Sequence, residues 1–186
     1  MAKKHLVVGI DWYGPYSLVQ AQKIAREYGK GGLYLCLGKR KGQHQRTLQY
    51  VGKSNAGLRS RLQRDHHKLR LVTRQQQFWL GVIATGNVPG KKKLVTPQAL
   101  RLAEWALARF LGLWLNDKLR EKLPPSPVTV LNRWWADEDQ ERPRYHRPHT
   151  DWPDLIDFLG PSYRTRLVWF GSPGRQRSVA AAKLLI

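Results

Sequence analysis

Two tyrosines occupy neighbouring strand-like runs of the sequence, and two arginines follow them. Tyr34 lies in "GLYLCLG", Tyr50 lies in "TLQYVGKS", and "GLRSRL" then offers Arg59 and Arg61. A guanidinium group can bind two phosphate oxygens at once, and nearby positive charge favours the phenolate form of a tyrosine. A lone strand tyrosine is more often a core aromatic. The pairing of the two tyrosines beside cations therefore indicates phosphate chemistry.

Glu104 is the candidate metal ligand. It is the only acidic residue between Asp65 and Asp117, and it lies in a strongly apolar stretch. A buried carboxylate is costly unless it has a partner, and Mg²⁺ prefers hard oxygen ligands. Phosphodiester hydrolysis needs neutralised phosphate charge and an activated water, which Mg²⁺ or a substituting Mn²⁺ would supply here. The alternative is a solvent-facing glutamate balanced by arginines of its own helix.

The order of these residues resembles the GIY-YIG nuclease family. Gly32-Leu33-Tyr34 stands at the first family signature, and Tyr50-Val51-Gly52, continued by Lys53, stands at the second. The family then has an arginine on a helix, a glutamate on a later helix and an asparagine about three turns beyond it. Arg61, Glu104 and Asn116 match these three elements.

The register of the arginine follows from its apolar neighbours. Leu58 and Leu62 stand three before and one after Arg61, as in the family pattern, so Arg61 is chosen and Arg59 is held in reserve. Some members place a histidine one turn later. Here Asp65 takes that place, and His66 and His67 follow it. We expect the two histidines to be exposed. His66 is nevertheless a candidate supporting residue of the site.

The resemblance implies a role for each residue. One tyrosine would activate the attacking water and the other would aid positioning, without a choice between them. Arg61 would bind the scissile phosphate, with Lys53 as a second cation. Glu104 would hold the metal, and Asn116 would either orient Glu104 or cap local backbone; the simple alternative is a polar residue that ends a helix.

The net charge of +20 makes nucleic acid the expected partner. Residues 1–136 hold 25 of the 33 basic side chains but only 6 of the 13 acidic ones. We expect double-stranded DNA to contact basic side chains in three places: Lys39, Arg40, Lys41, Arg64, Lys91, Lys92 and Lys93. The sequence shows no signal peptide and no run long enough to span a membrane, and its one cysteine excludes a disulfide framework. We therefore expect a cytoplasmic protein without a membrane partner.

Hydrophobic patterning and turn residues predict the elements that position these side chains. The predicted strands are 5–10, 32–38, 47–54, 77–85 and 166–171, with a turn at 11–16. The predicted helices are 17–31, 55–72, 97–123 and 151–159, the third capped by Thr96 with Pro97 in its first turn.

This order predicts an α/β sandwich with a small, mainly antiparallel three-stranded sheet flanked by helices. We expect one domain over residues 1–186, with a GIY-YIG-like core at about 31–118. Residues 1–30 and the Trp-, Pro- and Arg-rich residues 124–186 would be additions to that core.

The sequence thus predicts a magnesium-dependent DNA endonuclease that leaves a 5′-phosphate and a 3′-hydroxyl. A sequence-specific, restriction-type enzyme is the first expectation. A structure-specific repair or recombination nuclease and a non-catalytic nucleic-acid-binding module are the alternatives. Monomer and homodimer both remain open.

Overall fold

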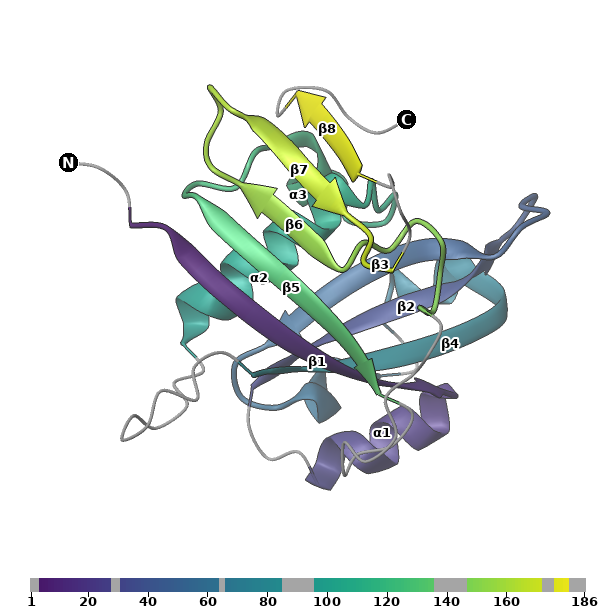
Figure 1. Ribbon diagram of the computed structural model, residues 1–186. Coiled ribbons are helices and arrows are strands. Elements are labelled where there is room, and N and C mark those ends of the chain that lie inside the picture. Colours follow the sequence, from purple (N-terminus) through teal and green to yellow (C-terminus); the bar gives the residue numbers. More distant parts are fainter. Residues whose placement is uncertain are drawn as a thin grey trace.

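Eight segments of the part of the chain that the structure describes form strands of a single sheet (Figure 1). The structure, a computed structural model, describes residues 4–27, 31–63, 66–84, 96–135, 147–171 and 176–180. The strands are β1 (Leu6–Tyr16), β2 (Gly32–Arg40), β3 (Thr47–Ser54), β4 (Val72–Ile83), β5 (Val128–Trp135), β6 (Leu155–Phe158), β7 (Arg164–Val168) and β8 (Gln176–Ala180). Their order is β3-β2-β4-β1-β5-β6-β7-β8. Among these described strands only β1 and β5 pair in parallel, so the sheet is mixed.

The expectation of a small three-stranded sheet flanked by helices is wrong. The predicted strands 32–38, 47–54 and 77–85 do lie side by side, as β3-β2-β4. The sheet then continues through β1, which pairs with β4 along one edge and with β5 along the other. The C-terminal residues extend the sheet because β5 and β7 alternate buried and more exposed side chains, a pattern that suits a sheet with one covered face.

Two further C-terminal predictions need correction. The predicted helix 151–159 is instead a loop that leads into β6, and the predicted strand 166–171 lies earlier, at Arg164–Val168. Asp157 is buried in the middle of β6, where Thr129 and Arg166 bond its two carboxylate oxygens. That partnership allows an acidic residue to occupy a buried strand position.

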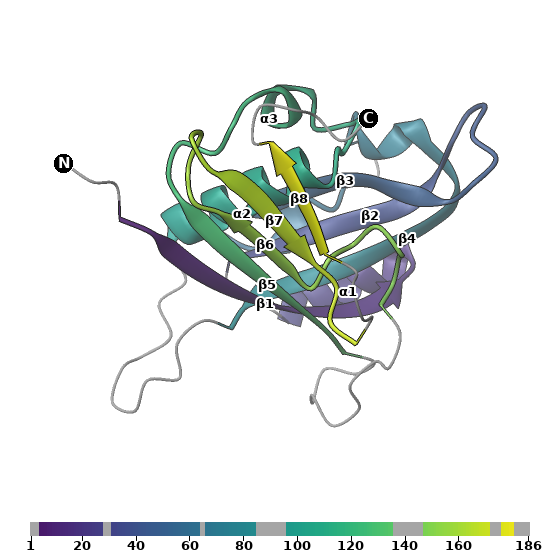
Figure 2. The ribbon, with the colours of Figure 1, turned by 45° about the horizontal axis from the view of Figure 1, so that its top comes forward.

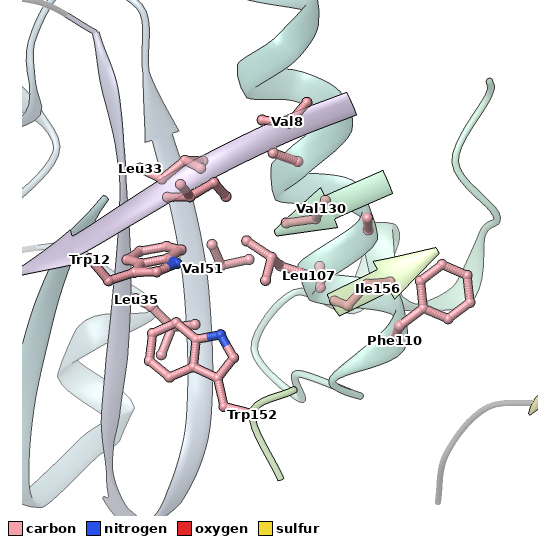
Figure 3. Close-up of a cluster of buried hydrophobic side chains, with 14 of the residues drawn as sticks. Val8, Trp12, Leu33, Leu35, Val51, Leu107, Phe110, Val130, Trp152 and Ile156 are labelled. Atoms are coloured by element: carbon pink, nitrogen blue, oxygen red, sulfur yellow. The ribbon is translucent and has the colours of Figure 1, made fainter. Parts of the chain in front are cut away.

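The sheet curves around helix α2 (Pro97–Phe110), which lies on its concave face (Figure 2). The core on this face joins α2 to β1, β2, β3, β5 and β6 (Figure 3). Trp152 packs edge-on against Trp12, with ring centroids 5.0 Å apart. Helix α1 (Leu18–Glu27) covers the opposite face, over a second buried cluster.

Strand β2 is buried on both faces, and its alternation decides where the tyrosines point. Leu33 and Leu35 belong to the core under α2. Tyr34 and Cys36 belong to the cluster under α1. Because successive strand side chains point to opposite faces, both signature tyrosines occupy the α1 face, at the edge where β3 ends the sheet.

The helix predicted over 97–123 begins as expected but ends early. The Thr96 hydroxyl accepts a hydrogen bond from the Ala99 N–H at 3.1 Å, which confirms the predicted cap. The helix ends at Phe110, and Gly112 follows with a φ of 63°. Glycine adopts this left-handed conformation without steric cost, which favours the reversal. A short helix α3 (Asp117–Glu121) follows, so Asn116 lies outside the helix that carries Glu104.

Segment 55–72 is not the predicted helix. It contains two short 3₁₀ turns, η1 (Leu58–Ser60) and η2 (Leu69–Leu71). Leu58, Leu62 and Leu69 are still buried, which explains their helix-like spacing. The predicted turn 11–16 is also wrong, because β1 continues to Tyr16 through an irregularity in its pairing with β4.

Among the described residues, none of the three α-helices combines the length and apolar character that a membrane-spanning helix requires.

Candidate active site at the edge of strand β3

Tyr34 and Tyr50 lie on adjacent strands with their ring centroids 5.9 Å apart. Tyr34 pairs across the ladder with Gly52, and Tyr50 pairs with Cys36. The Tyr34 ring lies directly over Gly52, where a Cβ atom would collide with the ring and its hydroxyl group. The hydroxyl groups of Tyr34 and Tyr50 also interact with each other. The glycine of the second signature therefore has a local role, which is to make room for the first tyrosine.

Burial raises the pKa of both tyrosines above the ordinary value. Arg61 acts in the opposite direction on both hydroxyls, but its effect is smaller than that of burial. The interaction between the two hydroxyl groups has opposite effects on them, because it raises the pKa of Tyr34 and lowers that of Tyr50. The residues of the chain alone thus keep both hydroxyls protonated at neutral pH, and Tyr50 loses its proton more readily.

His66 contacts both tyrosines. Its Nε2 atom lies 3.5 Å from the Tyr34 Oη atom, and its ring centroid lies 5.4 Å from that of Tyr50. His67 stacks on its other side, with centroids 5.2 Å apart. His66 is partly buried, so the expectation of two exposed histidines is wrong for it, whereas His67 is exposed. Burial and the nearby charges of His67 and Arg61 lower the pKa of His66, which keeps the ring neutral at pH 7.

Glu104 approaches the same site from α2. Its carboxylate accepts a hydrogen bond from the backbone N–H of Lys53. Burial raises the pKa of Glu104 to about 7, and the charges of Lys53 and Arg61 only partly oppose that effect. Glu104 also acts electrostatically on both tyrosines, where its negative charge raises the pKa of each hydroxyl. The carboxylate, the two hydroxyls and Arg61 therefore form one electrostatic unit.

The free edge of β3 explains how α2 and the segment after it come to this place. An edge strand leaves every second N–H and C=O group without a strand partner. The Asn116 side chain accepts from the Val51 N–H at 2.9 Å and donates to the Val51 carbonyl at 2.7 Å. The Leu115 N–H donates to the Gln49 carbonyl at 3.2 Å. Asn116 thus fixes the edge of β3, and among the described residues both of these side-chain hydrogen bonds go to Val51 rather than to Glu104.

The two candidate arginines face different hollows. Arg61 is exposed and lines a groove of about 410 Å³ together with Lys53 and residues 54–56. It acts electrostatically on Tyr34, Tyr50, His66 and Glu104. Arg59 lines a separate groove between α1 and η1. The geometry therefore favours Arg61 for binding a phosphate at the site.

The donor groups of the site suit Mg²⁺ or Mn²⁺, which keep water ligands, better than a metal ion such as Zn²⁺ that takes most of its ligands from the protein. Among the described residues, no group of three or more His, Cys, Asp or Glu side chains gathers as a metal cage. Mg²⁺ commonly keeps several waters and takes one or two carboxylates together with substrate phosphate. Glu104 offers one such carboxylate beside the hard hydroxyl oxygens of Tyr34 and Tyr50. A tetrahedral zinc site would need more ligands than this.

The expected DNA contacts divide into described and undescribed residues. Lys39 and Arg40 end β2, and Lys41 is exposed on the turn that leads to β3. Arg64, Lys91, Lys92 and Lys93 lie outside the described residues. Of the expected DNA contacts, only Lys39, Arg40 and Lys41 are described, and they lie on the hairpin that β2 and β3 form.

Comparisons of the chain with protein-family models, with curated proteins and with solved structures gave no match. The assignment of function accordingly depends on the residues and the geometry of the site.

Proposed function

We propose that this chain is a magnesium-dependent DNA endonuclease. The observation that carries the proposal is the electrostatic unit formed by Tyr34, Tyr50, Arg61 and Glu104 beside a basic groove. A partly buried carboxylate with a pKa of about 7 is an unfavourable choice for a purely structural position. The net charge of +20 supports a polyanionic substrate. Sequence-specific cleavage of the restriction type remains the first expectation for its biology.

Arg61 and Lys53 would bind the scissile phosphate. Both line the groove next to the tyrosines, and a guanidinium group can contact two phosphate oxygens. Glu104 and the tyrosine hydroxyls would hold Mg²⁺, which when bound neutralises phosphate charge and acidifies water. Holding the metal requires an ionised Glu104, so the pKa of about 7 makes metal binding sensitive to pH near neutrality.

Tyr50 is the better of the two tyrosines for activating water. Its interaction with the Tyr34 hydroxyl lowers the pKa of Tyr50 and raises that of Tyr34. His66 is neutral at pH 7 and lies against both rings, so it can take up a proton. In this scheme the water oxygen would bond to phosphorus while its proton passes to the Tyr50 oxygen and the proton of the Tyr50 hydroxyl passes to His66, and the bond from phosphorus to the 3′-oxygen would break. Solvent returns a proton to the 3′-oxygen, which leaves a 5′-phosphate and a 3′-hydroxyl.

Cleavage of unmethylated plasmid and phage DNA tests the proposal. We expect cutting with Mg²⁺ and none with EDTA. We expect Glu104→Gln to bind DNA but not to cut it, because the variant keeps the shape and loses the negative charge. Discrete fragments would support sequence recognition, and cutting only at branches or flaps would support the structure-specific alternative. Tight binding without cleavage of linear, supercoiled or branched DNA would overturn the nuclease proposal and favour a binding module.

A further inference from the structure

A second hollow lies at the opposite end of β3 from the candidate active site. Its volume is about 590 Å³, within the roughly 300–1,000 Å³ of typical small-ligand sites. It is bounded by the β2–β3 hairpin, the segment between α2 and α3, and the β7–β8 region. We call it the tryptophan pocket, and its principal lining residues are Gln43, Thr47, Trp114, Arg120, Trp169 and Arg177.

Trp114 is the unusual member of this pocket. Its side chain is 60% exposed, whereas most of the described tryptophans are core residues. The guanidinium groups of Arg40 and Arg120 lie 5.3 and 4.3 Å from the centre of its ring. Among the described residues, neither arginine lies within ion-pair distance of a carboxylate, although the charge of Arg120 reaches Asp117 at longer range and lowers the pKa of that residue. Two like charges beside one exposed indole repel each other, and an anion would relieve that repulsion.

The opposite wall of the pocket is also aromatic and cationic. Trp169 is buried, and its indole N–H donates to the Thr150 carbonyl, so it serves as a fixed wall. The Arg177 guanidinium lies 5.8 Å from the Trp169 ring centre. Among the described residues that line the pocket, the one carboxylate belongs to Asp151, which is exposed and lies near His149. Arginines therefore outnumber carboxylates around the pocket.

An exposed indole with adjacent guanidinium groups has the chemistry that binds an unpaired nucleotide. Bases stack on aromatic side chains and on arginine planes, while arginine charge binds the backbone phosphates. A base inside a duplex has its faces covered by its neighbours and cannot stack in this way. We propose that the tryptophan pocket binds an unpaired nucleotide of the DNA substrate, with its base against Trp114 and its phosphate between Arg40 and Arg120. This proposal rests on the proposed nuclease function for the identity of the nucleic acid.

The geometry of β3 relates the pocket to the cut site. Thr47 lines the pocket, and Lys53, six positions further along the strand, lines the groove of the active site. A strand rises about 3.3 Å per residue, so the two sites are roughly 20 Å apart along β3. One DNA strand advances about 3.4 Å per nucleotide in a duplex, so this span corresponds to roughly six nucleotides. The bound nucleotide would thus be a few positions from the cleaved phosphate.

Binding in EDTA tests the pocket independently of cleavage. The probes are fluorescein-labelled duplexes with and without one unpaired thymidine, and an oligothymidine of about 12 nucleotides. We expect the parent protein to bind the bulged duplex more tightly than the perfect one in anisotropy titrations. Trp114→Leu should weaken oligothymidine binding roughly ten- to a hundredfold, and Trp114→Phe should restore most of it because it keeps a ring.

Two matched controls separate stacking and charge from general effects. Tyr163 is also 60% exposed and lies outside the pocket, so Tyr163→Leu should bind as the parent does. Lys118 lies on α3 with Arg120, so Lys118→Gln removes the same charge as Arg120→Gln without touching the indole. Equal binding by Trp114→Leu and Tyr163→Leu, equal losses in the two charge variants, or no preference for the bulged duplex would each overturn the proposal.

The two proposals fail in different ways. If the pocket is wrong, Trp114→Leu binds normally while the plasmid digest still depends on Glu104. If the nuclease proposal is wrong, no DNA is cut while the Trp114-dependent binding in EDTA persists. Circular dichroism of every variant, with a thermal melt, confirms that a loss of binding does not arise from unfolding.

Discussion

The carboxylate of Glu104 accepts a hydrogen bond from the backbone N–H of Lys53, at the outer edge of β3. This bond ties α2 to the edge strand beside the two tyrosines. It also places a carboxylate where burial raises its pKa to about 7. The same residue therefore links folding stability, pH and the proposed chemistry, and each link can be measured separately.

Glu104→Gln should stabilise the metal-free protein above neutral pH. The ordinary pKa of 4.5 rises to about 7 on folding, so between these values the folded state keeps a proton that the unfolded state releases. The contribution of Glu104 to folding stability is therefore fully present below pH 4.5 and is lost as the pH rises through about 7. Partial exposure of Glu104 reduces the effect to about 1–3 kcal/mol between about pH 5 and pH 8. Urea unfolding of both proteins in EDTA measures it, and the other ionisable groups cancel in the difference.

Mg²⁺ supplies the control for that measurement. A metal held by Glu104 stabilises the parent protein near pH 8 and leaves Glu104→Gln unchanged, because only the parent offers the carboxylate. Equal stabilisation of the two proteins by Mg²⁺ would contradict the metal assignment, whatever the cleavage assays show.

Cleavage should rise with pH through about 7. Ionised Glu104 is needed to hold the metal, and its protonated fraction falls over this range. We expect the rate at low Mg²⁺ to increase about tenfold per pH unit below the apparent pKa and to level off above it. Raising the Mg²⁺ concentration should move the midpoint to lower pH, since metal and proton compete for one carboxylate. A midpoint that does not depend on Mg²⁺ would contradict this competition.

Gly52→Ala should disturb the site through Tyr34. The added methyl group meets the Tyr34 ring and hydroxyl, so the ring must move or the strands must separate. Overpacking of this kind costs about 1–3 kcal/mol, and the displaced hydroxyl should lower the cleavage rate as well. In a Tyr34→Ala background the same substitution should cost little. A double-mutant cycle by urea unfolding checks this, and additive effects would show that the collision is relieved elsewhere.

Asn116→Ala should destabilise the protein more than the neighbouring substitution Asp117→Asn. Asn116 bonds both the N–H and the C=O of Val51, and both residues are buried. Leaving these groups unpaired costs about 2–4 kcal/mol. Asp117 makes an ion pair with Lys68 on the surface, and its loss costs about 1 kcal/mol or less. Chemical denaturation of the two variants compares them, and similar losses would argue against edge pairing as the role of Asn116.

The part of the site that the sequence could predict comes from local patterns. Strand β3 has the predicted bounds, because a polar turn separates two apolar runs, and hairpin pairing then makes Tyr34 and Tyr50 neighbours. The cap at Thr96 is likewise a local signal. The reversal at Gly112 is local too, but the apolar residues beyond it continue the helical pattern and conceal the helix end.

The rest depended on contacts between distant segments. The parallel pairing of β1 with β5 joins residues far apart in the sequence, and neither strand carries a signal that names its partner. The β3 edge could be located only once the sheet order was known, so the pairing of Asn116 with Val51 was hidden as well. Burial of the tyrosines also follows from tertiary packing, and it reverses the simple expectation that nearby cations lower their pKa.

Arg61→Ala should abolish most of the cleavage, and Arg59→Ala should not. Arg61 lines the groove beside the tyrosines, whereas Arg59 faces a separate groove between α1 and η1. Removing a charged group that stabilises the transition state typically costs about a hundredfold or more in rate. Both variants lose one positive charge, so their general affinity for DNA should fall equally, and single-turnover cleavage at saturating protein isolates the difference in chemistry. If Arg59→Ala is inactive and Arg61→Ala is active, the scissile phosphate binds on the α1 side of η1, and the roles of Lys53 and the tyrosines must be reassigned with it.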